Sequence, residues 1–356
     1  MAVSPSRPTL RSLAAEAGVS PMTVSLALRN SSGVSEATRD RIKRLATQRG
    51  YQPDPVVTKL MYHLRTRRPT RFHSSIGGLT ERWPTGNEVR HIYSERVLTG
   101  LKERAAELGY AFNLIYFDEI AGHGQLQRML QSRGIEGLVI LPLLQPRDLS
   151  HLLDWQSFST VAVTSSVTAP RFHTVTPQHF ENMLTACKNL SMAGYRRIGL
   201  VLPKDWDLRT GHRWSGAMAW HNLHGSATPV HPYIGETHGP SLNTQLIRSW
   251  LKRENPDAVI CDDIGMSNLH DAVHSMPMAR RPRIVTLNWS TIRGESGIDQ
   301  RAELIGSAAI DILAGMIVHS EKGIPATAYT TLVMGSWVPP ASQDLAKRVL
   351  RKAKKA

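Results

Sequence analysis

Cysteine is scarce in this chain, which has only Cys187 and Cys261 among 356 residues. Two cysteines give no disulfide framework and no clustered spacing of a Cys-rich metal site. Both lie in apolar surroundings, so we expect buried, inert thiols. No apolar run approaches the roughly 20 residues of a membrane-spanning helix, and the first residues lack the apolar block of a secretory signal. We therefore expect a protein that stays in the cytoplasm and has no membrane partner.

Acidic residues are scarce at the two ends of the chain. Residues 1–72 hold 13 Lys and Arg against 4 Asp and Glu, and residues 347–356 hold 6 basic residues and no acid. The rest carries 24 basic and 25 acidic residues, so the formal charge of +14 lies almost entirely at the ends. A basic head on a neutral body indicates binding to a polyanion. For the tail, ordinary solvated surface charge is the simpler interpretation.

Motifs of catalysis are also lacking. The sequence has no GxGxxG, no P-loop and no GxSxG. His221 and His224 are spaced to meet a metal on one helix, but no third ligand stands out. Asp262 and Asp263 follow one strand, and adjacent side chains project differently, so they need not face a common site. We therefore predict no enzyme activity, no metal and no cofactor.

Residues 9–28 contain the capping and terminating residues of two short helices. Thr9 is suited to cap the first, and Gly18 ends it, because glycine tolerates the left-handed turn. Ser20 is suited to cap the second, and Pro21 occupies its first position, where a missing N–H costs nothing. Proline is therefore the mark of a helix start here.

A third helix is expected from Ser35, its cap, to Gly50. Helix, tight glycine turn and helix form the helix-turn-helix geometry, in which the start of the second helix reaches base edges. A generic small helical bundle is the alternative. The hydroxyl residues at the second helix start favour DNA, because hydroxyls contact phosphates.

At this point the sequence resembles the lactose-repressor (LacI/GalR) family of bacterial transcription regulators. The segments "TLRSLAAEAGVSPMTVS", "VSEATRDRI" and "GYQPD" follow the DNA-binding head of that family without a gap. The resemblance implies the base-reading residues Pro21, Met22 and Leu26. It also implies the phosphate-contacting residues Thr9, Ser20, Thr23, Ser25, Arg29, Thr38 and Tyr51.

Leu26 departs from the family, which usually has arginine at this position. Arginine can bind guanine through two hydrogen bonds, whereas leucine offers only apolar contact, for instance to a thymine methyl. We therefore expect an atypical operator.

The next segment is suited to a short hinge helix. Asp54 can cap it, with Pro55 at its first position. In the family, a hinge helix from each of two subunits enters the minor groove and a leucine wedges into the central base step. Leu60 falls on that position by resemblance. Taken alone, this leucine would favour a core position in an ordinary linker helix, but its register to the head favours the wedge.

From about residue 74, strand-like runs alternate with helical stretches. The apolar runs "SSIGGLT", "AFNLIYF", "GLVILPLL", "TVAVTS", "RRIGLVLP", "DAVICDD" and "RIVTLN" indicate parallel strands covered on both faces. Their number favours two α/β lobes with a cleft, and the resemblance implies a periplasmic-binding-protein-like body. We expect one lobe at 74–177 with a return near 302–330, and the other at 178–301 with the end of the chain.

The domain organisation predicted from these segments has four parts. They are a helix-turn-helix DNA-binding domain at 1–53, a hinge helix and linker at 54–73, a two-lobed effector-binding and dimerisation domain at 74–340, and a basic tail at 341–356.

Candidate effector residues follow the parallel strands, because ligands bind beyond the carboxyl ends of such strands. Arg213 matches a family arginine that holds effector hydroxyls. Asp262 and Asp263 replace the Asn-Asp pair that is more usual in the family, and Asn288 stands where the family typically has aspartate. These departures put a simple sugar as the effector in question. Three tryptophans could stack on a sugar face or pack in the core: Trp206, Trp83 and Trp289.

Three functions compete. The first is a regulator, most simply a repressor, that binds a pseudo-palindromic operator as a homodimer under the control of a sugar-like effector. The second is a ligand-binding protein of the transport-receptor type, which has no use for a basic helical head. The third is a carbohydrate-processing enzyme, for which no acid–base pair can be assigned.

Overall fold

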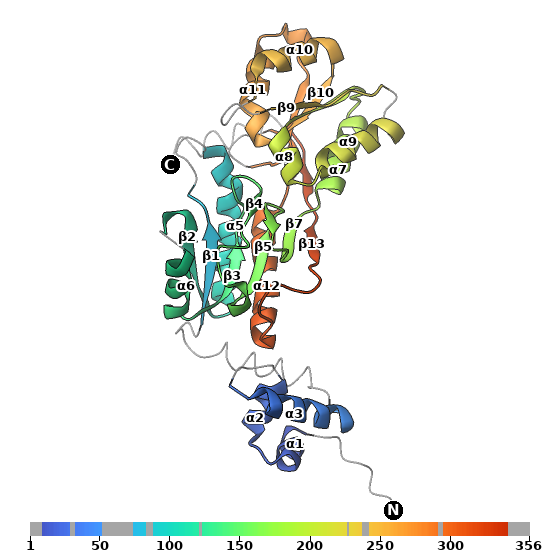
Figure 1. Ribbon diagram of the computed structural model, residues 1–356. Helices are drawn as coiled ribbons and strands as arrows, with labels where there is room; N and C mark the ends of the chain where they lie inside the picture. The colour runs from blue at the N-terminus through green and yellow to red at the C-terminus, as the bar shows by residue number, and fades with distance from the viewer. Residues whose placement is uncertain are drawn as a thin grey trace, which may run out of the picture.

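The computed structural model describes residues 9–28, 33–51, 74–82, 88–120, 123–225, 228–236, 242–290 and 295–340. They form a small helical head and a two-lobed α/β body (Figure 1). Arg29, the hinge with Leu60, Trp83 and the tail at 341–356 lie outside the described residues.

The head contains α1 (Leu10–Ala17), α2 (Pro21–Leu28) and α3 (Glu36–Gln48). Its core is small and closed, with Leu13, Val24 and Ile42 at most 1% exposed. Thr9 caps α1 in a reciprocal capping box with Ser12, and Gly18 ends the helix at φ 64°. The sequence predicted both ends of α1 correctly.

The start of α3 differs from the expectation. Ser35 is the N-cap residue, but its side chain makes no capping bond to the backbone. Its hydroxyl instead pairs with the Thr38 hydroxyl at 2.8 Å. The helix ends at Gln48 with Arg49 as C-cap, two residues before Gly50.

The first lobe is built on a parallel six-stranded sheet in the order β13-β7-β5-β3-β1-β2. Helices α5 (Glu88–Glu107) and α12 (Ala302–His319) cover one face, and α6 (His123–Ser132) covers the other. The strands are β1 (Ser74–Thr80), β2 (Tyr110–Tyr116), β3 (Ile135–Ile140), β5 (Ser159–Val163), β7 (His173–Pro177) and β13 (Thr330–Val333).

The second lobe has a six-stranded sheet in the order β14-β12-β11-β10-β8-β9, parallel except for the β12–β14 pair. Helices α7 (His179–Met192) and α9 (Arg213–His224) pack on one face, and α10 (Thr244–Glu254) and α11 (Asp263–His274) on the other. The strands are β8 (Ile198–Pro203), β9 (Tyr233–Gly235), β10 (Ala258–Cys261), β11 (Arg283–Thr286), β12 (Gly297–Asp299) and β14 (Ser336–Val338).

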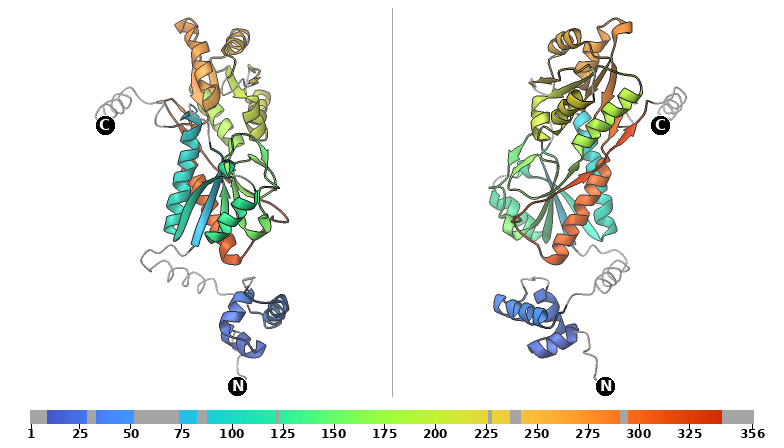
Figure 2. Two further views of the ribbon diagram at one scale, coloured as in Figure 1. Left: turned by 60° about the vertical axis from the view of Figure 1, so that its left-hand side comes forward. Right: turned by 90° about the vertical axis from the view of Figure 1, so that its right-hand side faces the viewer.

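The chain passes between the lobes three times, after β7, after β12 and after β13 (Figure 2). The predicted fold class, a helical head with a two-lobed body of parallel sheets, is confirmed. Both cysteines are buried, and burial raises the pKa of the Cys187 thiol to about 12, so the thiol stays protonated.

Helices α5 and α12 run close together because glycines face each other across the contact. A Cβ atom on Gly100 would lie 1.9 Å from the Glu303 carbonyl oxygen, and one on Gly306 would lie 2.2 Å from the Val97 carbonyl oxygen. Any larger side chain at either position would therefore push the helices apart. This close contact brings Arg96 of α5 beside Glu303 of α12.

Helix α12 is the one helix among the described residues that is long and apolar enough to cross a membrane by length and composition. It packs against α5 and the first sheet, and Ile305, Ala309, Ile310 and Leu313 are fully buried there. Its apolar composition therefore reflects its place in the core of the first lobe.

Candidate functional site

The head presents the start of α2 to solvent. Met22 is 62% exposed, whereas Val24 and Ala27 are fully buried. Leu26 is half-buried and packs against the core of the head. Two apolar side chains are expected to read bases. Met22 is therefore the more exposed of them, and Leu26 has only part of its surface available for contact with DNA.

The hydroxyl groups of the head hold its helix starts. The Ser20 hydroxyl accepts a hydrogen bond from the Thr23 backbone N–H at 3.0 Å and pairs with the Thr23 hydroxyl at 2.9 Å. The Thr9 hydroxyl accepts from the Ser12 N–H at 3.1 Å. These groups lie at helix N-termini, where backbone N–H groups also favour phosphate. Their contact with DNA stays a prediction, as does that of Thr38, Tyr51 and the α2 residue Ser25.

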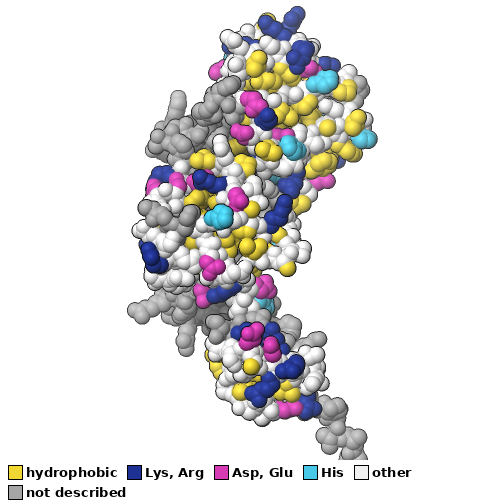
Figure 3. All heavy atoms as spheres, viewed as in Figure 1, with side chains coloured by type: hydrophobic (Ala, Val, Ile, Leu, Met, Phe, Trp, Pro, Cys, Tyr) yellow, Lys and Arg dark blue, Asp and Glu magenta, His cyan; other side chains and the backbone are white. Residues whose placement is uncertain are grey.

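Lys and Arg side chains lie on the visible face of the head, with a few acids among them (Figure 3). One of the cations is neutralised within the head, since Arg49 of the α3 C-terminus pairs with Glu16 of α1.

A cleft of about 700 Å³, open space included, lies where the two lobes face each other. It is lined at the carboxyl ends of β5, β8, β10 and β11, where parallel sheets bind ligands. The first lobe contributes Tyr93, Ser94, Thr164 and Ser165. The second contributes His179, Trp206, Arg209, Thr210, Trp214, Asp262, Asp263, Leu287, Asn288 and Gln300.

Two acids and an amide form one polar wall of this cleft. Asp262 caps α11, accepting from the Gly265 N–H at 3.1 Å. Asn288 donates its amide to Asp263 Oδ2 at 2.6 Å. Both aspartates thus line the same cleft, a question that the sequence had left open. The reason is that β10 runs directly into α11, so both occupy one helix N-terminus.

Arg213 spans the two lobes at the edge of the cleft. Its Nη1 donates to the Thr210 carbonyl oxygen at 3.3 Å and to the Ser165 hydroxyl of the first lobe at 3.4 Å. Trp206 lies within the cleft, with the Arg209 guanidinium carbon 4.6 Å above its ring centre. Trp289 lies elsewhere, where its carbonyl oxygen accepts from Arg96.

The turn between α8 (Lys204–Arg209) and α9 is held by one buried carboxylate. Asp207 Oδ2 lies 2.8 Å from His212 Nδ1 and 2.8 Å from the Ser215 hydroxyl. His212 takes the left-handed conformation at φ 58°, which is strained for a residue with a side chain. The Asp207 contacts stabilise this turn and so fix Arg213 relative to Trp206.

Sequence reasoning missed several polar residues of the cleft, Arg209 among them. Three of the missed residues, His179, Tyr93 and Ser94, each have a buried polar atom without a hydrogen-bond partner among the described residues. Burial, with further contributions from Arg213 and Arg209, lowers the pKa of His179 to about 3. His179 is therefore neutral near pH 7. Burial likewise raises the pKa of Tyr93.

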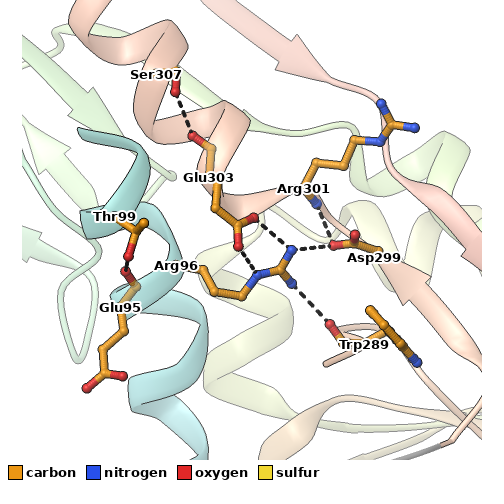
Figure 4. A network of polar contacts seen from close by, with 8 residues as sticks. All are labelled: Glu95, Arg96, Thr99, Trp289, Asp299, Arg301, Glu303 and Ser307. Atoms are coloured by element: carbon orange, nitrogen blue, oxygen red, sulfur yellow. Dashed lines mark hydrogen bonds and ion pairs between the residues drawn. The ribbon is translucent and has the colours of Figure 1, made fainter. Parts of the chain in front are cut away.

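Arg96 ties the two lobes together beside the cleft (Figure 4). Its guanidinium binds Glu303 of the first lobe at 2.6 and 2.7 Å, and reaches Asp299 of the second lobe at 2.9 Å. It also donates to the Trp289 carbonyl oxygen at 3.2 Å. Any movement of one lobe relative to the other at this point must therefore change the contacts of Arg96.

His221 and His224 both lie on α9, but the first is buried and the second stacks on Trp220. No group of three His, Cys, Asp or Glu in the described part of the chain is placed to hold a metal ion.

Residues 9–54 match the model of bacterial regulatory proteins of the lacI family. The head is therefore of the lacI-family type, and the whole chain is similar to regulators of that family. The chain is 26% identical to the sucrose operon repressor of Escherichia coli over 71% of its own length and 74% of that protein. It is also 26% identical to the transcriptional repressor CytR of E. coli K12, over 54% of its length and 53% of that protein.

Solved structures share the fold of this chain. A complex of the regulator CelR with cellobiose aligns at a TM-score of 0.56 and 20% identity, covering 94% of this chain and 99% of that one. A lac repressor dimer bound to operator and the anti-inducer ONPF aligns at 0.54 and 18% identity, covering 93% and 98%. The relatives named here are regulators rather than enzymes.

Proposed function

We propose that this chain is a transcriptional repressor that binds a two-fold symmetric operator as a homodimer, with its DNA affinity set by a sugar-like ligand in the cleft. The observation that carries the proposal is the presence, in one chain, of a lacI-family head and a polar cleft between two lobes. The repressor names of the relatives support the DNA partner, and the cellobiose complex supports a sugar-like ligand. The protein acts in the cytoplasm, without catalysis.

In this proposal Met22, Pro21 and part of Leu26 face the bases, and the capping hydroxyls of the head, with Arg29, face phosphates. Leu60 enters the minor groove from the hinge. The ligand contacts Arg213, Asp262, Asn288 and Trp206. The corresponding division of the chain is 1–53 for DNA binding, 54–73 for the hinge, 74–340 for ligand binding and dimerisation, and 341–356 for the basic tail.

The proposal is tested by selecting DNA sequences from a random library with the full chain. We expect enrichment of a two-fold symmetric site, because one head covers only a half-site. Met22→Glu should lower affinity for the selected site by about tenfold or more, since it adds a negative charge beside the phosphates. A glutamate at this position suits a helix N-terminus, so the head should still fold.

Met192→Glu is the matched control, because Met192 is 77% exposed on the second lobe. It should bind the selected site like the unaltered chain. The proposal fails if no sequence is enriched, or if both variants bind the selected site with unchanged affinity.

A further inference from the structure

A second arginine, Arg209, lines the cleft, four residues before Arg213. Arg209 ends α8, is 8% exposed, and lies over the Trp206 ring. A guanidinium presents N–H donors in a rigid plane that matches the paired oxygens of a carboxylate or phosphate. Stacking on Trp206 fixes the orientation of that plane. Arg209 is therefore a preorganised donor group within the cleft.

Two hydroxyl groups of the first lobe line the same cleft. The Tyr93 and Ser94 hydroxyl oxygens are buried and have no hydrogen-bond partner among the described residues. A buried hydroxyl left without a partner destabilises the folded chain, so a bound ligand that accepts from these groups is stabilised. Anionic oxygens are the strongest acceptors for such donors.

Both signs of charge act on buried groups beside the cleft. Burial and then the charges of Arg213 and Arg209 lower the pKa of His179. Burial and then the charges of Asp262, Asp263 and Glu295 raise the pKa of Cys261, the last residue of β10. Neutral His179 adds no charge, so the two arginines supply the positive charge beside it.

Arg213 donates its hydrogen bonds to neutral groups. Its two hydrogen-bond acceptors, the Thr210 carbonyl and the Ser165 hydroxyl, are both neutral. Within the described residues, no carboxylate forms an ion pair with Arg213. The positive charge of Arg213 thus remains available to a ligand.

We propose that the ligand of this cleft is an acidic sugar or sugar phosphate, whose carboxylate or phosphate binds between Arg209 and the Tyr93 and Ser94 hydroxyls, with its own hydroxyls toward Asp262 and Asn288. This inference rests on the proposed function and narrows its ligand class. Since Arg209 belongs to the second lobe and Tyr93 to the first, the anionic group joins the lobes. A neutral sugar lacks this link.

The test is calorimetric binding of matched ligand sets to the full chain. The sets are glucose, glucuronate and glucose 6-phosphate; galactose and galacturonate; and fructose and fructose 1-phosphate. In at least one set the anionic member should bind about tenfold tighter than the neutral one. Arg209→Gln should remove this preference, whereas Arg196→Gln, at an exposed arginine of the second lobe, should keep it.

Two further measurements complete the test. One uses a variant that should fold, and the other uses a ligand that has no sugar ring. Tyr93→Phe keeps the ring and removes only the unpartnered hydroxyl, so it should fold and still weaken the anionic ligand. Inorganic phosphate should raise the melting temperature of the unaltered chain and of Arg196→Gln more than that of Arg209→Gln.

The inference is overturned if neutral members bind as tightly as anionic ones, if no anionic member binds, or if phosphate stabilises Arg209→Gln as much as the unaltered chain. The proposed function is judged separately by operator binding. Operator binding that responds to a neutral sugar would leave the proposed function standing and overturn only the acidic ligand.

Discussion

Met22 and Leu26 form the edge of α2 that is expected to face the major groove, and their side chains differ in exposure. Met22 is largely exposed, and Leu26 contributes part of its side chain to the core of the head. Neither can make paired hydrogen bonds to a base, so specificity should lean on apolar contacts and on DNA deformability.

Leu26→Arg should therefore create a preference for guanine at the facing base pair, by about 1–3 kcal/mol for a two-bond contact. The exposed part of Leu26 gives an arginine a route to solvent, so its charge need not be buried. Binding-site selection with the variant measures the change. An unaltered base preference would mean that residue 26 does not face the groove.

His179 offers a prediction about stability and pH. Its pKa is about 3 in the folded chain and about 6.5 when unfolded. Between these values the unfolded chain binds a proton that the folded chain does not, so stability falls as pH decreases from about 6.5 toward 3. Other groups titrate here too, but His179→Phe removes only this contribution.

The difference in unfolding free energy between His179→Phe and the unaltered chain should therefore shift in favour of the variant as pH falls from 7 to 5. Chemical denaturation at each pH measures it. A difference that does not change with pH would mean that His179 is accessible to protons in the folded chain.

Among the elements, α5 carries two arginines in different surroundings. Arg96 is 22% exposed and joins Glu303 to Asp299 across the lobes. Arg104 is 34% exposed and pairs with Glu107 and Asp311, which are at least half exposed. Arg96→Gln should cost on the order of 2 kcal/mol of unfolding free energy, because it leaves two partly buried carboxylates without their cation.

Arg104→Gln is the control and should cost less than about 1 kcal/mol, as exposed ion pairs do. Denaturation of both full-length variants under the same conditions makes the comparison. Equal losses would show that the link between the lobes adds nothing beyond an ordinary surface pair.

The elements also show what the sequence could predict. The apolar runs predicted β1, β2, β3, β5, β8, β10 and β11 correctly, because strands buried on both faces read as continuous apolar segments. Short strands such as β12 and β14, three residues each, lack that signal. Trp206, Asp262 and Asn288 were placed in the cleft because they follow such runs.

Tyr93 and Ser94 could not be found in this way. They lie within α5, where a polar pair reads as solvent-facing surface, and only the packing of the second lobe over that helix places them in the cleft. Arg209 was missed because the family match pointed to Arg213, four residues later. The α8–α9 turn, held by Asp207, determines whether Arg209 or Arg213 lies deeper in the cleft.

At the scale of the whole molecule, the single head of each chain predicts a two-fold symmetric dimer. One head covers a half-site, and a two-fold symmetric operator needs two heads one or more helical turns apart. We therefore expect a homodimer at micromolar concentration, measured by light scattering with and without DNA. A monomer under both conditions would contradict it.

The central claim is that a ligand in the cleft sets the DNA affinity of the head, and operator affinity with and without ligand tests it most directly. In the unaltered chain, a ligand found by calorimetry should change the Kd for the selected operator by about 5-fold or more. Arg213→Ala should bind the same operator within about twofold of the unaltered chain and should not respond to the ligand. A ligand that leaves the operator Kd of the unaltered chain unchanged, or that shifts it equally in Arg213→Ala, would contradict the account.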